Sequence, residues 1–571
     1  MPEEPEDPTA EELLEADQIQ GNILAGFNKD HQVFLFLRIE QTGEKAPSQE
    51  TVAAVKAWLR ALAPQISSLN EVHRFNELFR TLRARLGRDP HGVSATWMNI
   101  AFSAAALEIL TSSQDVAEFK DSFFLDGLPA RSSDLADPTD ETAEGHPNQW
   151  VVGGPRNPAD ILVIVASDSP AALAERVAQL KASLSQATLP ETGEAIGSAL
   201  RIVWEEAGET LPPPLTGHEH FGFKDGISQP GVRGLIRRSP AEYVTPRVID
   251  PAKSPQPDPR IPEFARPGQP LVWPGQFVFG YKAQNPNDAR VPREDLMMSG
   301  PAWARNGSYL VMRRLRQDVR AFRDFVVSES ARVSALSGFE GMTPKRFASM
   351  LVGRWPGGSP LARSPLSEDE DLGRDGFANN FFQFELNSPP PLELKSDVGY
   401  NGDTFSLSME DSKGAVCPFS AHVRKVNPRD ITTERGTRQD VLTRLILRRG
   451  IPFGPPYPED PGDAMLATGE VGTQRGLIFV SYQTSIENQF AFLQTNWANH
   501  GRNPNRSGGE DPIIGQSPDE PRRHRFFEIT APGHPPVTRE LVEEWVIPTG
   551  GGFFFSPSIS AISEVLGRPL A

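Results

Sequence analysis

The hydrophobic pattern of the first half of the chain predicts strands separated by amphipathic helices. Continuous apolar runs are typical of buried strands, and they occur at 32–39, 95–102, 161–166 and 200–204. Apolar residues at helical spacing are found at 49–62 and 104–110, and a third helix is expected from Pro170 to about Leu184. The order strand, helices, strand, strand, helix, strand predicts a ferredoxin-like α+β sheet with helices on one face.

The second half repeats this mixture without a visible residue-level repeat. Strands are expected at 276–281, 308–313, 477–482 and 550–555. Helices are expected at 318–333, 344–351, 439–447 and 486–497, and the stretch 364–414 is expected to be irregular. We therefore predict an α+β protein of two ferredoxin-like domains with antiparallel sheets. The predicted divisions are a disordered acidic tail (1–17), an N-terminal domain (18–239), a proline-rich loop (240–270) and a C-terminal domain (271–571).

Composition narrows the functions that this fold could serve. The chain has 571 residues, with 57 Lys and Arg against 74 Asp and Glu, a net charge of −17 that disfavours a nucleic-acid partner. The single cysteine, Cys417, excludes an internal disulfide and a cysteine metal cage. No apolar run reaches the roughly 18 residues of a membrane span. Since no secretory signal is visible at the start, a cytoplasmic location is expected, with export by an unusual route and the oligomeric state left open.

The first candidate for chemistry is Asp225, in the segment Phe221–Pro230. It lies between glycines, which allow a ligand to approach the backbone closely, and near two phenylalanines. An acid held against an apolar wall is expected to have a raised pKa suited to proton transfer. An ordinary Asp-Gly turn is the structural alternative.

The second candidate is His422, in the segment Cys417–Arg429. It is surrounded by small and apolar residues, with arginines two and seven positions later. A neutral imidazole is a good axial ligand for haem iron, and nearby cations can pair with haem propionates. A core histidine hydrogen-bonded to the backbone is the alternative.

These segments resemble those of one known family. Gly222–Gly226 matches the GxxDG signature of dye-decolourising (DyP-type) haem peroxidases, and Cys417–Arg429 is similar to that family's proximal-histidine segment. Leu447–Gly450 resembles its distal-arginine segment. Further similarity at Gln20–Leu24 and Gly550–Phe554 extends the resemblance over about residues 18–558, and the length suggests the longer, fungal-like branch.

The resemblance implies haem b held mainly by the C-terminal domain. His422 would be the proximal iron ligand, Asp225 the distal acid–base residue and Arg448 the distal cation. Cofactor contacts are expected at Gly226, and propionate contacts at Arg424 and Arg429, for which surface ion pairs are the alternative.

Three further expectations concern the surroundings of the haem. A proximal histidine normally donates its other N–H to an acceptor, and Glu487 is a candidate for that partner, with a solvent-facing glutamate as the alternative. His218 and His220 are interpreted as loop histidines that could line haem access. Electrons could enter through a surface Trp or Tyr; Tyr400, Trp355 and Trp497 are among the candidates, although most such residues should be core residues.

The implied activity is reduction of hydrogen peroxide coupled to oxidation of dyes, phenolics or other bulky one-electron donors, through an oxoferryl haem. A distal carboxylate predicts an acidic pH optimum. Two alternatives remain at this stage. One is a haem-binding or haem-transfer protein without significant peroxide turnover, and the other is a haem-free assembly module.

Overall fold

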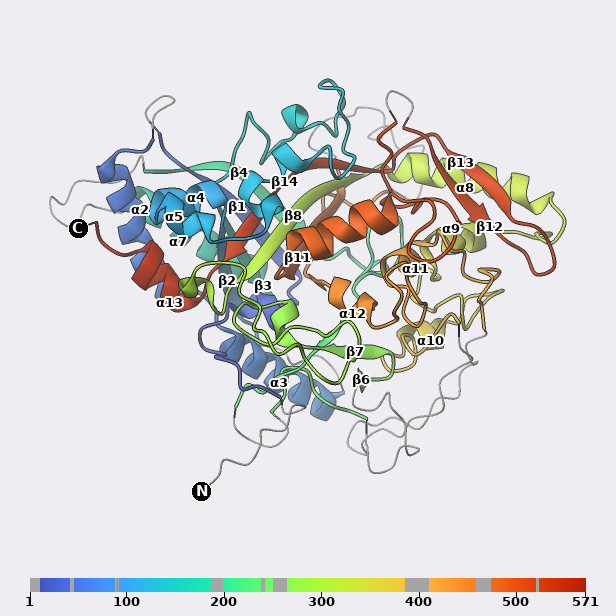
Figure 1. Ribbon diagram of the computed structural model, residues 1–571, viewed down its shortest axis with the longest axis horizontal. Coiled ribbons are helices and arrows are strands. Elements are labelled where there is room, and N and C mark those ends of the chain that lie inside the picture. Colours follow the sequence, from blue (N-terminus) through green and yellow to red (C-terminus); the bar gives the residue numbers. More distant parts are fainter. Residues whose placement is uncertain are drawn as a thin grey trace.

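Strands from both halves of the chain lie together in the middle of the molecule (Figure 1), and their pairing forms one closed barrel. The computed structural model of the protein describes residues 11–41, 46–87, 90, 92–186, 199–237, 242–249, 264–385, 410–458, 474–519 and 523–570. Among these residues a nine-stranded sheet has the order β10-β4-β1-β3-β2-β14-β8-β11-β9, and β10 also pairs with β11. The additional pairing closes the ring.

The first half has the predicted ferredoxin-like order. Its strands pair in the antiparallel order β4-β1-β3-β2, and helices cover one face. The elements are β1 (His31–Ile39), α2 (Gln49–Leu62), β2 (Thr96–Phe102), α4 (Ala104–Leu110), β3 (Ile161–Ser167), α7 (Pro170–Gln186) and β4 (Leu200–Glu209). Each strand and helix predicted from the apolar runs of this half is present.

The second half repeats the same strand order as β14-β8-β11-β10. Its strands are β8 (Ser308–Gln317), β9 (Leu447–Arg448), β10 (Ile451–Phe453), β11 (Gly476–Gln483) and β14 (Val546–Ser556). Helix α8 (Val319–Ser334) follows β8, and two π-helical segments, Ile486–Ala491 and Leu493–Ala498, follow β11. The two halves are therefore topological copies, although their sequences show no residue-level repeat.

Among the described residues, two short strand pairings join the halves. β2 meets β14 where Phe102 pairs with Phe555, and β10 meets β4 where Phe453 pairs with Gly208. A side chain at Gly208 would collide with Ile451, since its Cβ would lie 2.4 Å from Ile451 Cγ2. Glycine therefore permits the close approach at the second junction.

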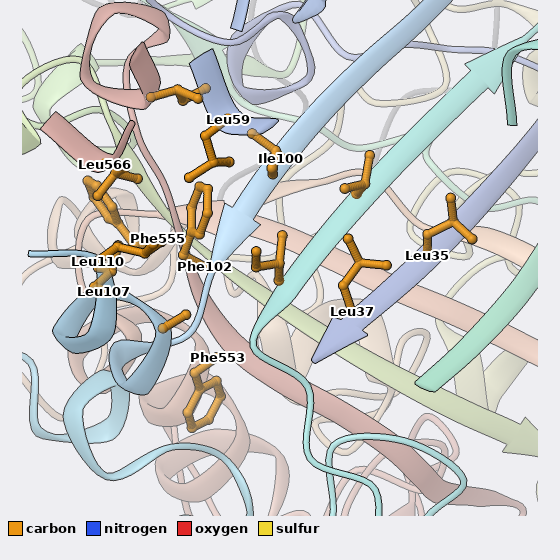
Figure 2. Close-up of a cluster of buried hydrophobic side chains, with 14 of the residues drawn as sticks. Leu35, Leu37, Leu59, Ile100, Phe102, Leu107, Leu110, Phe553, Phe555 and Leu566 are labelled. Atoms are coloured by element: carbon orange, nitrogen blue, oxygen red, sulfur yellow. The ribbon is translucent and has the colours of Figure 1, made fainter. Parts of the chain in front are cut away.

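Alternate residues of each strand enter different hydrophobic clusters, as the two-residue period of a strand requires. Leu35 and Leu37 of β1 pack with Leu59 of α2 and Leu107 of α4, together with Phe555 (Figure 2). Their neighbours Phe34 and Phe36 instead join a cluster shared with strands of the second half. Burial on both faces explains why the strands appear in the sequence as continuous apolar runs.

The remaining elements lie around the barrel. They are α1 (Gly21–Leu24), α3 (Leu69–Leu86), α5 (Ser113–Ala117), α6 (Ser122–Asp126), β5 (Gly231–Val232), β6 (Phe264–Arg266), β7 (Gln269–Val272), α9 (Pro344–Val352), α10 (Glu370–Arg374), α11 (His422–Val426), α12 (Asp440–Arg444), β12 (Arg525–Ile529), β13 (Val537–Leu541) and α13 (Ile559–Ala561). Helix α3 was not predicted, because only Leu69 and Val72 among its 18 residues are buried. The sequence carries one local sign of this helix, a capping box at its first turn formed by Ser68 and Glu71.

Three predicted elements differ from the structure. Residues 276–281 form no strand; they follow a short 3₁₀ turn and reverse at Gly280, where φ is +87°. The helix predicted over 439–447 ends at Arg444, because Leu447 pairs with Tyr482 of β11. The predicted irregular stretch 364–414 contains α10, and 386–409 lies outside the described residues.

The predicted disordered tail is wrong for residues 11–17. Glu11 pairs with Arg247 at 2.7 Å, and Leu14 is buried in the cluster that includes Phe34. Burial of Leu14 and this ion pair hold the segment against the barrel. The chain is therefore ordered from at least Glu11, and the domain boundaries stay predictions.

Candidate functional site

A cavity of about 300 Å³ lies where segments from both halves of the chain meet. Asp225 and Gly226 reach it from the segment after β4, His422 from α11, Arg448 from β9 and Arg429 from the segment after α11. Five of the seven predicted site residues therefore line one cavity. The volume of this cavity lies at the lower end of the range for small-molecule binding sites.

Asp225 and Arg448 form a direct pair at this cavity. Arg448 donates through Nη1 to Asp225 Oδ1 at 2.9 Å and through Nη2 to the Ser228 carbonyl at 3.2 Å. Gln229 joins the same two segments, since it accepts from the backbone N–H of Arg448 and donates to its carbonyl. The acid and the cation are thus held together by main-chain contacts as well as by charge.

The pKa of Asp225 is lowered, which contradicts the expectation of a raised value. Loss of solvent around the carboxyl raises its pKa, but the charge and hydrogen bond of Arg448 and the backbone N–H of Gly226 together outweigh that effect. Gly226 donates to Oδ1 at 2.6 Å from a backbone with φ +72°, a conformation that favours glycine. The side chain keeps 35% of its surface exposed, and it opens onto the cavity.

His422 is oriented by Asp511. Its Nδ1 lies 2.8 Å from Asp511 Oδ2, and the aspartate side chain is fully buried. Asp511 Oδ1 accepts from the backbone N–H groups of Ile513 and Ile514. Because a carboxylate can only accept, Nδ1 carries a proton, and in the neutral ring Nε2 is then the nitrogen with the free lone pair.

Glu487 is not the partner of His422, so that prediction is wrong. Its carboxylate accepts from Ser122 at 3.5 Å, and its backbone N–H donates to Asp121. Glu487 does not line the cavity. The true partner, Asp511, lies 89 residues from the histidine in sequence, and no local motif marks it.

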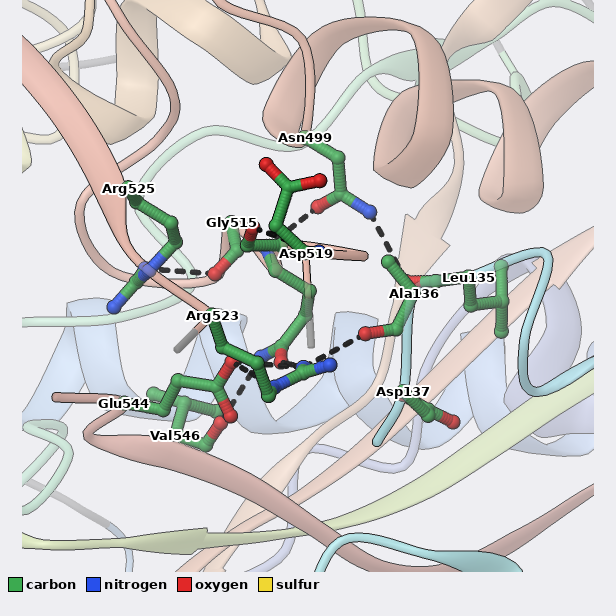
Figure 3. Close-up of polar contacts among 12 residues, drawn as sticks. Leu135, Ala136, Asp137, Asn499, Gly515, Asp519, Arg523, Arg525, Glu544 and Val546 are labelled. Atoms are coloured by element: carbon green, nitrogen blue, oxygen red, sulfur yellow. Dashed lines mark hydrogen bonds and ion pairs between the residues drawn. The ribbon is translucent and has the colours of Figure 1, made fainter. Parts of the chain in front are cut away.

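The segment that carries Asp511 is anchored by two arginines (Figure 3). Arg525 donates to the carbonyl of Gly515 at 2.7 Å and to that of Asp511 at 3.3 Å. Arg523 donates to the side chain of Gln516 in the same segment at 2.8 Å and to the carbonyl of Ala136 in the other half of the chain. These bonds fix the segment on which the orientation of His422 depends.

Arg424 does not reach the cavity, so the predicted propionate contact at this residue is wrong. It is 2% exposed, pairs with Asp411 at 2.9 Å and lies between the rings of Phe384 and Phe419. The physical reason is helical geometry, because residues i and i+2 of a helix do not share a face. His422 and Arg424 belong to the same short helix, α11.

The two histidines before Asp225 have different surroundings. His220 is 2% exposed and hydrogen-bonds the Phe453 carbonyl at 2.9 Å, and burial lowers its pKa to about 4. It is a neutral core histidine and does not line the cavity. His218 lines a separate hollow, described below.

Glu219 is a site residue that the sequence reasoning missed. Its carboxylate accepts from the backbone N–H groups of Phe221 and Phe223, both at 2.9 Å, and from the side chain of Gln317. Loss of solvent raises its pKa to about 7, although these hydrogen bonds oppose the rise. Glu219 thereby fixes the turn that leads to Asp225.

A second hollow of about 270 Å³ lies on another side of the acid–cation pair. Asp225, Arg448 and Glu219 line both spaces. The second hollow is also lined by Lys29, Asn28, Thr210 and His218. Asp225 and Arg448 thus form part of a wall between two separate spaces.

The aromatic candidates for electron entry are core residues where they are described. Trp355 is 3% exposed, and Trp497 is fully buried. Tyr400 lies outside the described residues. The expectation that most such aromatics are core residues holds for both tryptophans.

The residues of the first cavity fit an iron porphyrin. His422 offers a free nitrogen with its proton held on the other side of the ring, which suits an axial ligand. The walls are largely apolar, with Ile227, Val423, Leu445, Phe479, Phe490, Leu493 and Ile513. In the part of the chain that the structure describes, no group of three or more His, Cys, Asp or Glu side chains forms a rival metal site.

Within the described ranges, no helix is both long enough and apolar enough to cross a bilayer.

A closed α+β barrel with a free imidazole nitrogen and a carboxylate–arginine pair on one cavity defines a protein of the haem-peroxidase class. Comparison with known proteins specifies this further. Residues 18–199 match the family described as "DyP dimeric alpha+beta barrel domain".

Relatives cover nearly the whole chain. A dye-decolorizing peroxidase of Mycetinis scorodonius is 29% identical over 99% of this chain and 92% of its own length. The structure of an ancestral D-type dye decolorizing peroxidase superposes with a TM-score of 0.72 at 28% identity, covering 97% of this chain and 100% of that one. A fungal DyP-type peroxidase from Auricularia auricula-judae gives 0.67 at 26% identity, covering 97% of this chain and 99% of its own. The chain therefore carries the DyP barrel domain over residues 18–199 and is similar to dye-decolourising peroxidases over nearly its whole length.

Proposed function

We propose that this peroxidase binds haem b through Nε2 of His422 and reduces hydrogen peroxide while oxidising bulky one-electron donors such as dyes and phenolics. The observation that supports this most directly is the shared cavity. It is lined both by a histidine with a free ring nitrogen and by the Asp225–Arg448 pair. When bound, haem supplies the iron at which peroxide is activated and the electrons of the donor are accepted.

The acid–cation pair has the two roles that cleavage of peroxide requires. Asp225, held ionised by Arg448, can accept the proton of the inner peroxide oxygen and return it to the departing outer oxygen. Arg448 is a fixed cation that stabilises the charge developing on that oxygen. Glu219 holds the turn that leads to Asp225, and Gln229 holds the backbone of Arg448.

The second hollow is a separate approach to the same pair. It is lined by polar side chains, among them Asn28, Lys29 and Thr210, which suit a small polar oxidant. We infer that peroxide reaches Asp225 through this hollow.

The experiment compares haem retention with peroxide turnover in three variants. Arg448→Leu and Asp225→Asn are expected to keep the Soret band of wild type and to lose turnover by about 10²–10³-fold. Glu487→Gln, a charge-removing control at a residue that does not line the cavity, should change neither property. Turnover that is equally low in wild type and in Arg448→Leu would favour a haem-binding or haem-transfer protein. A wild-type chain that takes up no haem would contradict the proposal as a whole.

A further inference from the structure

The residue after Arg448 is a second arginine, and its guanidinium binds main-chain oxygens. Arg449 donates through Nη2 to the carbonyls of Ile23 and Leu24 at 3.1 and 3.0 Å. Through Nε it donates to the Asn22 carbonyl at 2.9 Å, and through Nη1 to the carbonyl of Arg448 at 3.1 Å. One side chain therefore ties Arg448 to α1, which lies about 425 positions away in the sequence.

The carbonyls bound by Arg449 belong to a segment that is anchored in the barrel. Gln20 donates through Nε2 to the Ile100 carbonyl of β2 at 2.9 Å and to a carbonyl just after β14 at 2.8 Å, and its Oε1 accepts from the Ile100 N–H. A Cβ at Gly21 would lie 2.4 Å from Cγ2 of Val72 in α3, so this packing requires glycine. Helix α1 is therefore a fixed support, and these contacts explain two residues of the Gln20–Leu24 motif that take no part in the proposed chemistry.

The turn after α1 leaves room for Arg449. The backbone of Gly26 has φ +73°, and a Cβ there would lie 2.9 Å from Arg449 Nε. The Asn22 side chain fixes this turn, since its Oδ1 accepts from the Phe27 N–H at 3.0 Å and its Nδ2 lies 3.4 Å from the Tyr482 hydroxyl. Glycine at position 26 is thus needed both for the backbone conformation and for the space that the guanidinium occupies.

At its other end Arg449 restrains the main chain of Arg448. The Arg448 carbonyl accepts from Gln229 Nε2 as well as from Arg449, both at 3.1 Å. The backbone N–H of Arg449 donates to the Val480 carbonyl at 2.7 Å. The Arg448 guanidinium itself makes one hydrogen bond to Asp225 and one to a carbonyl. Its aim at the carboxylate therefore depends on where the main chain holds it.

The charge of Arg449 makes this contact set demanding. Burial lowers the pKa of Arg449 to about 10, which Tyr482 opposes and the adjacent charge of Arg448 reinforces. A desolvated cation is costly unless its donors are satisfied. The carbonyls of α1 meet that need, so the helix and the guanidinium hold each other in one position.

We propose that Arg449 is a positioning residue for Arg448 and that α1 is the support through which it acts. The inference rests on the proposed function and deepens it, because it names what aims the distal cation at Asp225. Loss of the Arg449 bonds removes one of the two donors to the Arg448 carbonyl and lets its guanidinium turn away from the carboxylate. The effect should be a weaker form of the effect of removing Arg448.

Fluoride binding to the ferric holoenzyme measures this aim without turnover, because a bound anion accepts a charge-assisted hydrogen bond from a cation beside the iron. Arg448→Leu should weaken fluoride binding at least about tenfold. Arg449→Met should weaken it about three- to tenfold, and the double variant should match Arg448→Leu alone within about twofold, since a support has no effect once the supported group is absent. Arg449→Met should also move the acid limb of the profile of kcat/KM for peroxide against pH to higher pH, by less than Arg448→Leu does.

The matched control is Arg60→Met. Arg60 also donates to a carbonyl at the end of a helical segment, that of Gly567, but it lines neither space beside Asp225. It should keep the wild-type fluoride affinity. If Arg449→Met does not fold, Gly26→Ala crowds the same guanidinium from the other side and should weaken fluoride binding in the same direction.

The outcomes separate this inference from the proposed function. Losses that multiply in the double variant, or wild-type fluoride affinity in both Arg449→Met and Gly26→Ala, would show that Arg449 does not act through Arg448. Fluoride affinity equal in wild type and Arg448→Leu, or a wild-type chain that takes up no haem, would instead contradict the proposed function and this inference with it.

Discussion

Replacing Asp511 by asparagine removes the negative charge behind His422 without changing the size of the side chain. The wild-type carboxylate accepts from His422 Nδ1 at 2.8 Å and from Ile513 and Ile514 through its other oxygen. An amide cannot serve both sides. If its oxygen stays on the backbone, its NH₂ faces Nδ1, and the ring must then carry its proton on Nε2. That tautomer has no lone pair for an axial ligand.

The size of the effect follows from the burial of this hydrogen bond. Asp511 is fully buried, so the bond is protected from solvent. A hydrogen bond to a charged group contributes about 1.5–3 kcal/mol. A tenfold change in an equilibrium constant corresponds to about 1.36 kcal/mol and, for one electron, to about 59 mV. If the energy of this hydrogen bond favours the ferric over the ferrous state, its loss therefore raises the one-electron reduction potential by about 65–130 mV. Haem affinity should fall about 10–100-fold, as for other outer partners of metal ligands.

Spectroelectrochemical titration of the Soret band measures the potential, and haem titration measures the affinity. Asp519→Asn is the matched control, because it removes the same charge from an exposed residue of the same segment (Figure 3). It should leave both quantities at their wild-type values. If Asp511→Asn matches Asp519→Asn in both measurements, Asp511 does not act on the iron through His422, and the reasoning fails.

Three further perturbations test the other side of the cavity. Arg448→Leu removes the cation that lowers the pKa of Asp225, so the acid limb of the profile of kcat/KM for peroxide against pH should move to higher pH; an unshifted limb would dissociate Asp225 from that titration. Glu219, whose pKa is raised to about 7, binds a proton in the folded state that the unfolded chain releases near pH 4.5, so wild-type stability should fall as pH rises from about 4.5 to 7. Glu219→Gln should flatten that part of a plot of unfolding midpoint against pH, and an unchanged slope would show that another group titrates. Thr210→Trp should fill the second hollow and raise the KM for peroxide without altering the haem spectrum, whereas an unchanged KM would mean that peroxide enters by another path.

The strands could be predicted from the sequence because both of their faces are buried. Apolar runs such as 161–166 have no other simple interpretation, and β3 lies where that run predicts a strand. Closure of the barrel could not be predicted. It depends on the pairs Phe102–Phe555 and Phe453–Gly208, which join residues hundreds of positions apart through single contacts.

At the site, the motifs in the sequence indicated three residues that line the cavity, but not the residues that hold them in place. His422, Asp225 and Arg448 all line the cavity as expected. The partner of His422 was sought in a chemically suitable segment, which led to Glu487 instead of Asp511, and a second cavity cation was sought at Arg424, which is buried away from the cavity. Asp511 is brought to His422 only by the tertiary fold, so the spacing of the two residues in the sequence could not predict their contact.

The pKa of Asp225 is likewise set by a residue that only the fold brings near. The phenylalanines beside it in sequence suggested an apolar environment and a raised pKa. In the folded chain the dominant opposing charge comes from residue 448, and the pKa is lowered. A carboxylate that stays ionised in acid can still accept a proton from peroxide there. The expected acidic optimum therefore follows more directly from the observed Asp225–Arg448 pair than from the apolar wall that first suggested it.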